Sequence, residues 1–121
     1  MNNLFKEKRV MHIDTSCKLH ENKDTGIAYR IIGSNLHKGI TLSKKLKKFL
    51  RKNLNIKDLA IIYSIAIYYL IKDDLELFDI LIICGDEKFN KVKKYLNILF
   101  KNNQDYSKKE IISIGELRII T

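Results

Sequence analysis

Three acidic residues stand where different secondary-structure elements are expected to begin or end. Asp14 falls in a strand-like string, Asp58 opens a long apolar run, and Asp86 closes a second strand-like string. Carboxylates are costly to bring together unless a cation shares them, and oxygen ligands suit hard divalent metals. These three residues therefore predict a metal site built from separate elements.

Two of these acids also have a local interpretation. Asp58 lies three residues after Asn55, a spacing that resembles a capping box and puts negative charge at a helix N-terminus. Asp86 follows Gly85 and could cap the next helix. Asp14 is harder to explain in this way, because an acid in a central strand needs a partner.

Basic residues dominate one interval of the chain. The formal net charge is +9, and no acid lies between Asp24 and Asp58. A block of one sign attracts polyanions, most commonly phosphate backbones, although it can also be a solvated surface. The residues expected to bind nucleic acid are Lys44, Lys45, Lys48, Arg51 and Lys52.

Hydrophobic periodicity predicts three strands in the first third of the chain. Residues 8–17 form the first, and the isoleucine-rich segments 25–33 and 37–42 form the next two around a turn-like Gly33-Ser34-Asn35. The short connections predict a three-stranded antiparallel meander.

Two helices are expected next. Ser43 is a good N-cap for a helix over 44–52. Its apolar stripe at helical spacing comprises Leu46, Phe49 and Leu50. The second helix, 56–72, is capped by Asn55 and is apolar on nearly every side, which is typical of a helix buried on more than one side.

The remainder alternates between strand and helix. Residues 78–85 are continuously apolar, as in a central strand, residues 87–101 have helical spacing, and 110–120 offer a last strand. The sequence thus predicts one α/β domain over residues 1–121, with a five-stranded mixed sheet flanked by helices.

This order, with acids at these points, resembles the ribonuclease H-like superfamily. The family has Asp-Gly-Ser on its first strand, where this chain has IDTSC at 13–17, and a small-residue second strand similar to TGIAY at 25–29. Its helix acid is a glutamate, where 58–60 read DLA. Its fourth strand ends in an Asp soon followed by an aromatic, and DEKF at 86–89 is similar.

The resemblance implies a nuclease that hydrolyses RNA or an RNA/DNA hybrid. In this family two Mg²⁺ or Mn²⁺ ions about 4 Å apart activate water and stabilise the leaving oxygen. Asp14, Asp58 and Asp86 would be the catalytic metal ligands, with Glu116 or Glu110 as a fourth. Their mutual repulsion would raise their pKa values in the metal-free protein.

Two other functions remain open. Thr15 and Asp58 depart from the family's glycine and glutamate, so the chain could be a catalytically degenerate module that binds nucleic acid through 44–57. It could also be a subunit of a larger complex that docks through the isoleucines and tyrosines of 61–69. The nuclease differs from both of these alternatives in its requirements, because only catalysis needs a metal.

Neither the N-terminus nor the interior has an apolar segment typical of targeting or membrane insertion. Residues 1–8 lack a signal-peptide core, and the longest apolar run is too short to span a bilayer and contains Ser64. We expect a cytoplasmic protein with no membrane partner. Its oligomeric state has no signal in the sequence.

Overall fold

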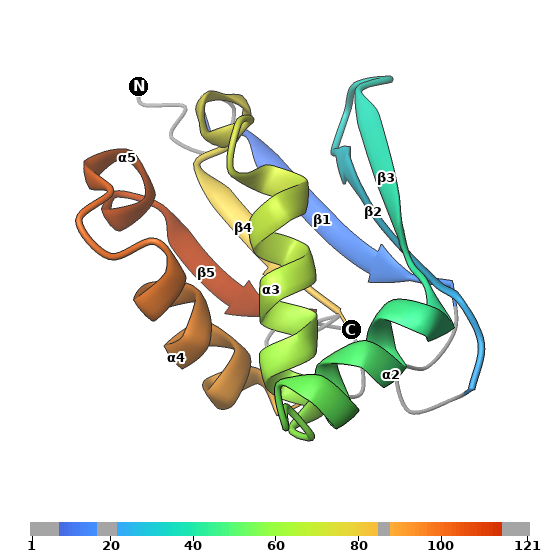
Figure 1. Cartoon of the computed structure of the whole chain (residues 1–121). Coiled ribbons are helices and arrows are strands. Elements are labelled where there is room, and N and C mark those ends of the chain that lie inside the picture. The colour runs from blue at the N-terminus through green and yellow to red at the C-terminus, as the bar shows by residue number, and fades with distance from the viewer. Residues whose placement is uncertain (1–7, 17–21, 85–87, 115–121) are drawn as a thin grey trace, which may run out of the picture.

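Five strands form one mixed sheet in the computed structural model, which describes residues 8–16, 22–84 and 88–114 (Figure 1). The order across the sheet is β3-β2-β1-β4-β5. The strands are β1 (Val10–Thr15), β2 (Thr25–Ile31), β3 (His37–Leu42), β4 (Ile80–Ile83) and β5 (Glu110–Ser113).

The sheet is antiparallel on one side and parallel on the other. β1 pairs antiparallel with β2, and β2 pairs antiparallel with β3, which confirms the predicted meander. β4 runs parallel to both β1 and β5. The predicted α/β class, with a five-stranded mixed sheet flanked by helices, is therefore confirmed.

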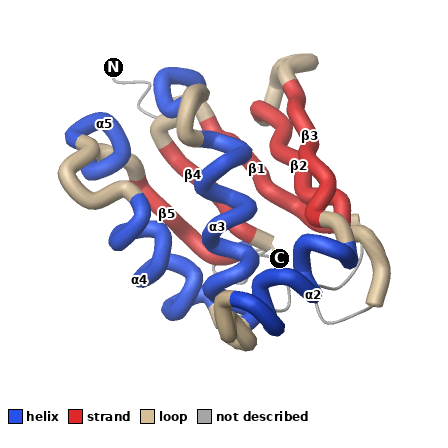
Figure 2. Tube along the Cα trace, in the orientation of Figure 1, coloured by secondary structure: helices blue, strands red, loops and turns tan. Residues whose placement is uncertain are grey.

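Helices α2, α3 and α4 all lie on the same side of this sheet, as the tube in Figure 2 shows. The helical segments are α2 (Lys44–Asn53), α3 (Leu59–Ile71), the 3₁₀ turn η1 (Leu75–Leu77), α4 (Phe89–Leu99) and the short α5 (Gln104–Ser107). In the part of the chain that the structure describes, no helix combines the length and apolarity needed to cross a membrane.

The core lies between the sheet and α3. On β1, Met11 and Ile13 are fully buried and belong to one apolar cluster with the residues of α3 and α4. α3 is buried on several sides, as its all-round apolar pattern predicts. Most of 61–69 is consequently unavailable as a docking surface, although Tyr69 is 61% exposed.

The start of α3 differs from the prediction. Asn55 has a φ of 54°, in the left-handed region, so it ends the preceding turn and caps no helix. Asp58 is the N-cap, and its carboxylate accepts from the backbone N–H of Ala60 at 2.9 Å. The predicted capping box is therefore wrong, while the predicted negative charge of Asp58 at the N-terminus of the helix is confirmed. The helix begins three residues later than predicted.

Candidate functional site

Asp14 is exposed near the carboxyl end of β1. Side chains alternate along a strand, so Asp14 lies on the sheet face opposite to buried Met11 and Ile13. Its cross-strand partner is Ala28, and Ala28 in turn pairs with Gly39. These small residues leave a hollow of about 480 Å³ that Asp14 lines.

Gly26 and Ser16, which both line this hollow, lie in close contact. The backbone N–H of Gly26 donates to Ser16 Oγ at 2.8 Å. A Cβ at position 26 would lie 2.9 Å from that same oxygen, so a larger residue would displace Ser16. The Asp14 carboxylate itself accepts from the Thr15 N–H at 2.8 Å.

Asp58 is neutralised by a cation from α4. Besides capping α3, its carboxylate lies 3.1 Å from Lys91 Nζ. The hydrogen bond from Lys91, followed by that from the Ala60 N–H, lowers the pKa of Asp58, and the same contact raises the pKa of Lys91. The sequence-based expectation was that repulsion among the three acids raises the pKa of Asp58. Because the pKa is lowered instead, that expectation is wrong for this residue.

The elements that carry the predicted site meet at one end of the sheet. The Cys84 N–H donates to Ile13 O at 3.1 Å, which places the end of β4 beside the end of β1. Tyr63 on α3 donates its hydroxyl to Cys84 O, so the N-terminal half of α3 covers the same end. Asp58 begins this helix, however, on the face of the sheet opposite to Asp14.

The remaining predicted ligands are not brought to this end. Asp86 and Glu116 lie outside the described residues. Glu110 pairs with Ile80 at the start of the parallel strands, which removes it from the end that holds Asp14. Within residues 8–16, 22–84 and 88–114 no three His, Cys, Asp or Glu side chains gather in a way that could hold a metal ion. The three-acid site stays a prediction.

The basic residues predicted to bind nucleic acid are presented by α2. Lys44, Lys45, Lys48 and Lys52 are exposed and Arg51 is half-buried. We call these five residues the α2 basic face. Among the described residues none of their side chains forms an ion pair, and Ser43 caps the helix by accepting from the Leu46 N–H at 3.0 Å.

The side of α2 that is buried differs from the prediction. Of the expected apolar stripe only Leu50 is buried, while Leu46 and Phe49 are 44% and 48% exposed. Lys47 takes the inward position and is 3% exposed. Its ammonium donates to Lys23 O at 2.8 Å and to Thr25 Oγ1 at 2.6 Å, because a buried charge must be hydrogen-bonded. Nothing near Lys47 in the sequence signals these partners.

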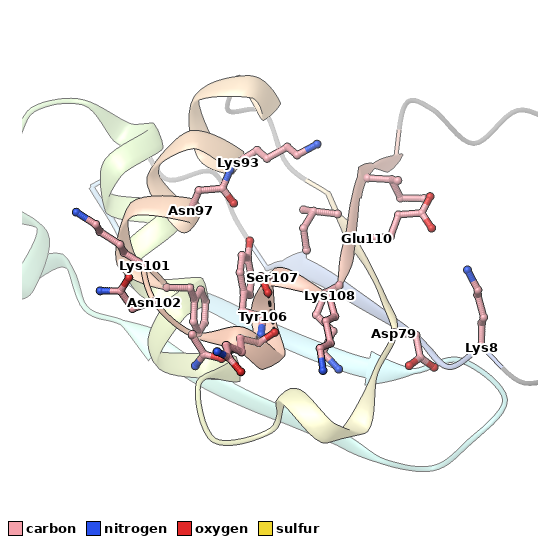
Figure 3. A pocket seen from close by; sticks show the side chains of 16 residues that line it. Lys8, Asp79, Lys93, Asn97, Lys101, Asn102, Tyr106, Ser107, Lys108 and Glu110 are labelled. Carbon is pink, nitrogen blue, oxygen red and sulfur yellow. Dashed lines mark hydrogen bonds between the residues drawn. The ribbon is translucent and has the colours of Figure 1, made fainter.

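A larger hollow, of about 1040 Å³, lies elsewhere, between α4, α5 and β5 (Figure 3). The side chains of Lys93, Lys101 and Lys108 point away from one another there, so they form no common anion site. The Asp79 carboxylate accepts a hydrogen bond from the backbone N–H of Arg9 at 2.8 Å. The Tyr106 hydroxyl is buried without a hydrogen-bond partner in the described part of the chain, and burial raises its pKa to about 12.

Comparisons with protein-family models, curated proteins and solved structures find no match to this chain.

Proposed function

We propose that this chain binds nucleic acid through the α2 basic face. The observation that carries the proposal is that a ten-residue helix presents four exposed lysines without an acidic partner in the described structure. Phosphate backbones bind such cations because the contact releases condensed counterions into solution. The net charge of +9 adds a long-range attraction to the local one.

The position of charge along α2 supports the same proposal. The first turn contains no acid, while Arg51 and Lys52 lie in the last turn, where the helix dipole favours cations. The carboxylate of Asp24 is the acid nearest to the helix start, and it accepts from the Lys44 backbone N–H at 2.8 Å. The lysine side chains themselves are left to solvent and to an external anion.

A charge-removal series tests the proposal. Lys45, Lys48 and Lys52 are changed together to Gln, and a matched triple variant carries Gln at Lys93, Lys94 and Lys101, which are also exposed, on and beside α4. Binding of labelled single-stranded RNA is measured by fluorescence anisotropy over a range of salt concentrations. Both variants lose the same net charge, so only the location differs.

The α2 variant should lose about two units of the log–log salt slope, or about a hundredfold in affinity near 0.1 M salt, since each lysine on a single strand contributes about 0.7. The α4 variant should keep most of the slope. Equal losses in both would mean that net charge alone attracts RNA, and no loss in either would end the proposal.

The ribonuclease H-like architecture is part of this proposal. It is supported by the strand order β3-β2-β1-β4-β5, with an antiparallel meander followed by two parallel strands, which is the arrangement that the sequence resemblance implies. In that architecture the module would hold nucleic acid whether or not cleavage is retained.

Metal-dependent cleavage of RNA or an RNA/DNA hybrid is the second candidate function. The exposed position of Asp14, lining a hollow at the end of β1 beside the end of β4, favours it. The described residues do not by themselves fit Mg²⁺ or Mn²⁺, because Asp58 is paired with Lys91 and no group of three ligands forms. A metal would depend on Asp86 and Glu116.

Cleavage assays separate this candidate from binding alone. Wild type and Asp14→Asn are incubated with labelled RNA, DNA and hybrid strands in Mg²⁺ or Mn²⁺, with Asp73→Asn as a matched exposed control. An enzyme should lose on the order of a hundredfold or more in rate with Asp14→Asn, because a first metal ligand is removed. RNA affinity should persist. A wild type inactive with both metals would leave only the binding function.

A further inference from the structure

We infer that α2 binds a single strand, with an unpaired base stacked on the ring of Phe49. The inference rests on the proposed function and names its substrate class. It starts from an aromatic side chain that is 48% exposed in the middle of α2, the most basic of the described helices. An exposed Phe costs solvation free energy unless a partner covers it.

The ring of Phe49 has no aromatic or cation–π partner in the described part of the chain. The other ring contacts there join Tyr68, Tyr69, Phe100 and Tyr106, and the cation–π pairs involve three other lysines. Leu46, one turn before Phe49, is also exposed and provides an adjoining apolar surface. Phe49 is therefore available to an external planar group.

Lysines surround this ring at the spacing of neighbouring helix positions. Lys45 precedes Phe49 by four residues and Lys52 follows it by three, so both neighbour it on the helix surface, with Cβ atoms about 5–6 Å apart. Flexible lysine side chains can then bind the phosphates on both sides of a nucleotide whose base covers the ring. Aromatic rings set among cations in this way are typical of single-strand binding.

A single strand fits this surface better than a duplex. In a duplex the faces of the bases are covered by their neighbours, and placing one on Phe49 would require unstacking and unpairing. A single strand offers its bases without that cost, and stacking accepts any base. Duplex binding would use the lysines alone and leave the apolar surface of Phe49 in water.

An anionic membrane would be the other polyanionic occupant. A helix that lies on a membrane inserts a wide apolar side, whereas the exposed apolar residues within α2 are only Leu46 and Phe49, and its remaining apolar residue is buried against the protein. The observations favour the single strand, and the membrane becomes an outcome of the test.

The absence of tryptophan from the chain makes a direct test possible. Phe49→Trp introduces the single indole of the protein, and Tyr69→Trp places one at another exposed aromatic position on α3 as the matched control. Each is titrated with a single-stranded oligonucleotide of about a dozen nucleotides, with the same sequence as a duplex, and with vesicles of equal parts phosphatidylserine and phosphatidylcholine.

Single strands should quench the indole at position 49 and leave that at position 69 unaffected. Phe49→Ala should weaken single-strand binding by about fivefold to a hundredfold, the range for loss of one stacked base. It should leave the salt slope and the duplex affinity unchanged. Lys48→Gln should instead lower the salt slope for both the single strand and the duplex, because phosphate contacts do not depend on stacking.

Each failure has its own signature. If Phe49→Ala binds single strands like wild type while Lys48→Gln lowers the slope, the stacking inference is wrong and the proposed function stands. If neither variant changes the affinity or the salt slope, the stacking inference and the proposed function are both wrong. Quenching of the position-49 indole by vesicles, without quenching by single strands, would assign the surface to a membrane and overturn the inference. Circular dichroism melts establish that each variant is folded.

Discussion

α2 and α4 both carry lysines and aromatic residues, but these side chains differ in their contacts with the rest of the molecule. In α4, Lys91 is paired with Asp58, while Lys93 and Lys94 each lie 6.0 Å from the centre of a ring on the same helix. The exposed lysines of α2 have no such contacts among the described residues.

The two helices also bury different kinds of residue. α4 buries Val92 and Leu96 against α3, and Ser64 of α3 reinforces the contact by donating to Val92 O at 3.2 Å. α2 buries Lys47 with Leu50 and exposes its aromatic ring. Lysine content therefore does not identify a binding helix. What distinguishes α2 is that, among the described residues, its exposed lysines form no ion pair or cation–π contact and its ring has no aromatic or cation–π partner.

Among the substitutions that test this comparison, we expect the largest change in the free energy of unfolding at Lys47. Lys47→Ala removes a buried ammonium and leaves Lys23 O and Thr25 Oγ1 without that donor, so it should lower the free energy of unfolding by about 3 kcal/mol. Urea denaturation followed by circular dichroism measures the change. Lys93→Ala on α4, which is exposed, should stay within about 0.5 kcal/mol.

A second variant separates anchoring from charge. Lys47→Met keeps most of the side-chain volume, so it should destabilise less than Lys47→Ala, because apolar replacement of a buried charge is often nearly neutral. Neither variant should alter the salt slope of RNA binding, since Lys47 is not exposed to phosphates. Wild-type stability in Lys47→Ala would mean that the ammonium does not hold α2 in its observed rotation.

The same two helices show what the sequence could predict. Periodicity located both of them, and Ser43 was correctly identified as the N-cap of α2. The N-cap of α4 is Lys88 and not the suggested Asp86. On α4, the apolar residues Val92 and Leu96 of the predicted helical segment 87–101 are buried, while Leu99 is exposed. On α2 the pattern failed, because Lys47 can bury its apolar stem while its ammonium bonds to residues more than twenty positions earlier.

The candidate site was predictable only in part for a related reason. The sequence gives Asp58 a place at the start of a helix, and it is indeed the N-cap of α3. Its ion pair with Lys91 joins residues 33 positions apart and follows from the packing of α3 on α4. Strand alternation, by contrast, is readable from the sequence, and it separates Asp14 from the buried residues of β1.

The smallest effect concerns Asp58, where the α4 cation meets the start of α3. Asp58→Ala removes the N-cap and should cost about 1 kcal/mol at pH 7, with little more from the ion pair because the Asp58 side chain is 31% exposed. Asp73→Ala is the matched control, since that carboxylate is well exposed and, among the described residues, pairs only with the adjacent Lys72. Urea unfolding of both variants measures the difference.

The pH dependence of this cost identifies its electrostatic part. The pKa of Asp58 is lowered in the folded protein, so the carboxylate stabilises the fold above its unfolded pKa near 4 and loses that contribution as pH falls through the folded pKa. The cost of Asp58→Ala should therefore shrink as pH falls below the unfolded pKa and through the lowered folded pKa. A variant more stable than wild type at pH 7 would show instead that neighbouring carboxylates repel Asp58. That result would favour the metal-dependent nuclease, because crowded acids are what a metal site requires before its cation binds.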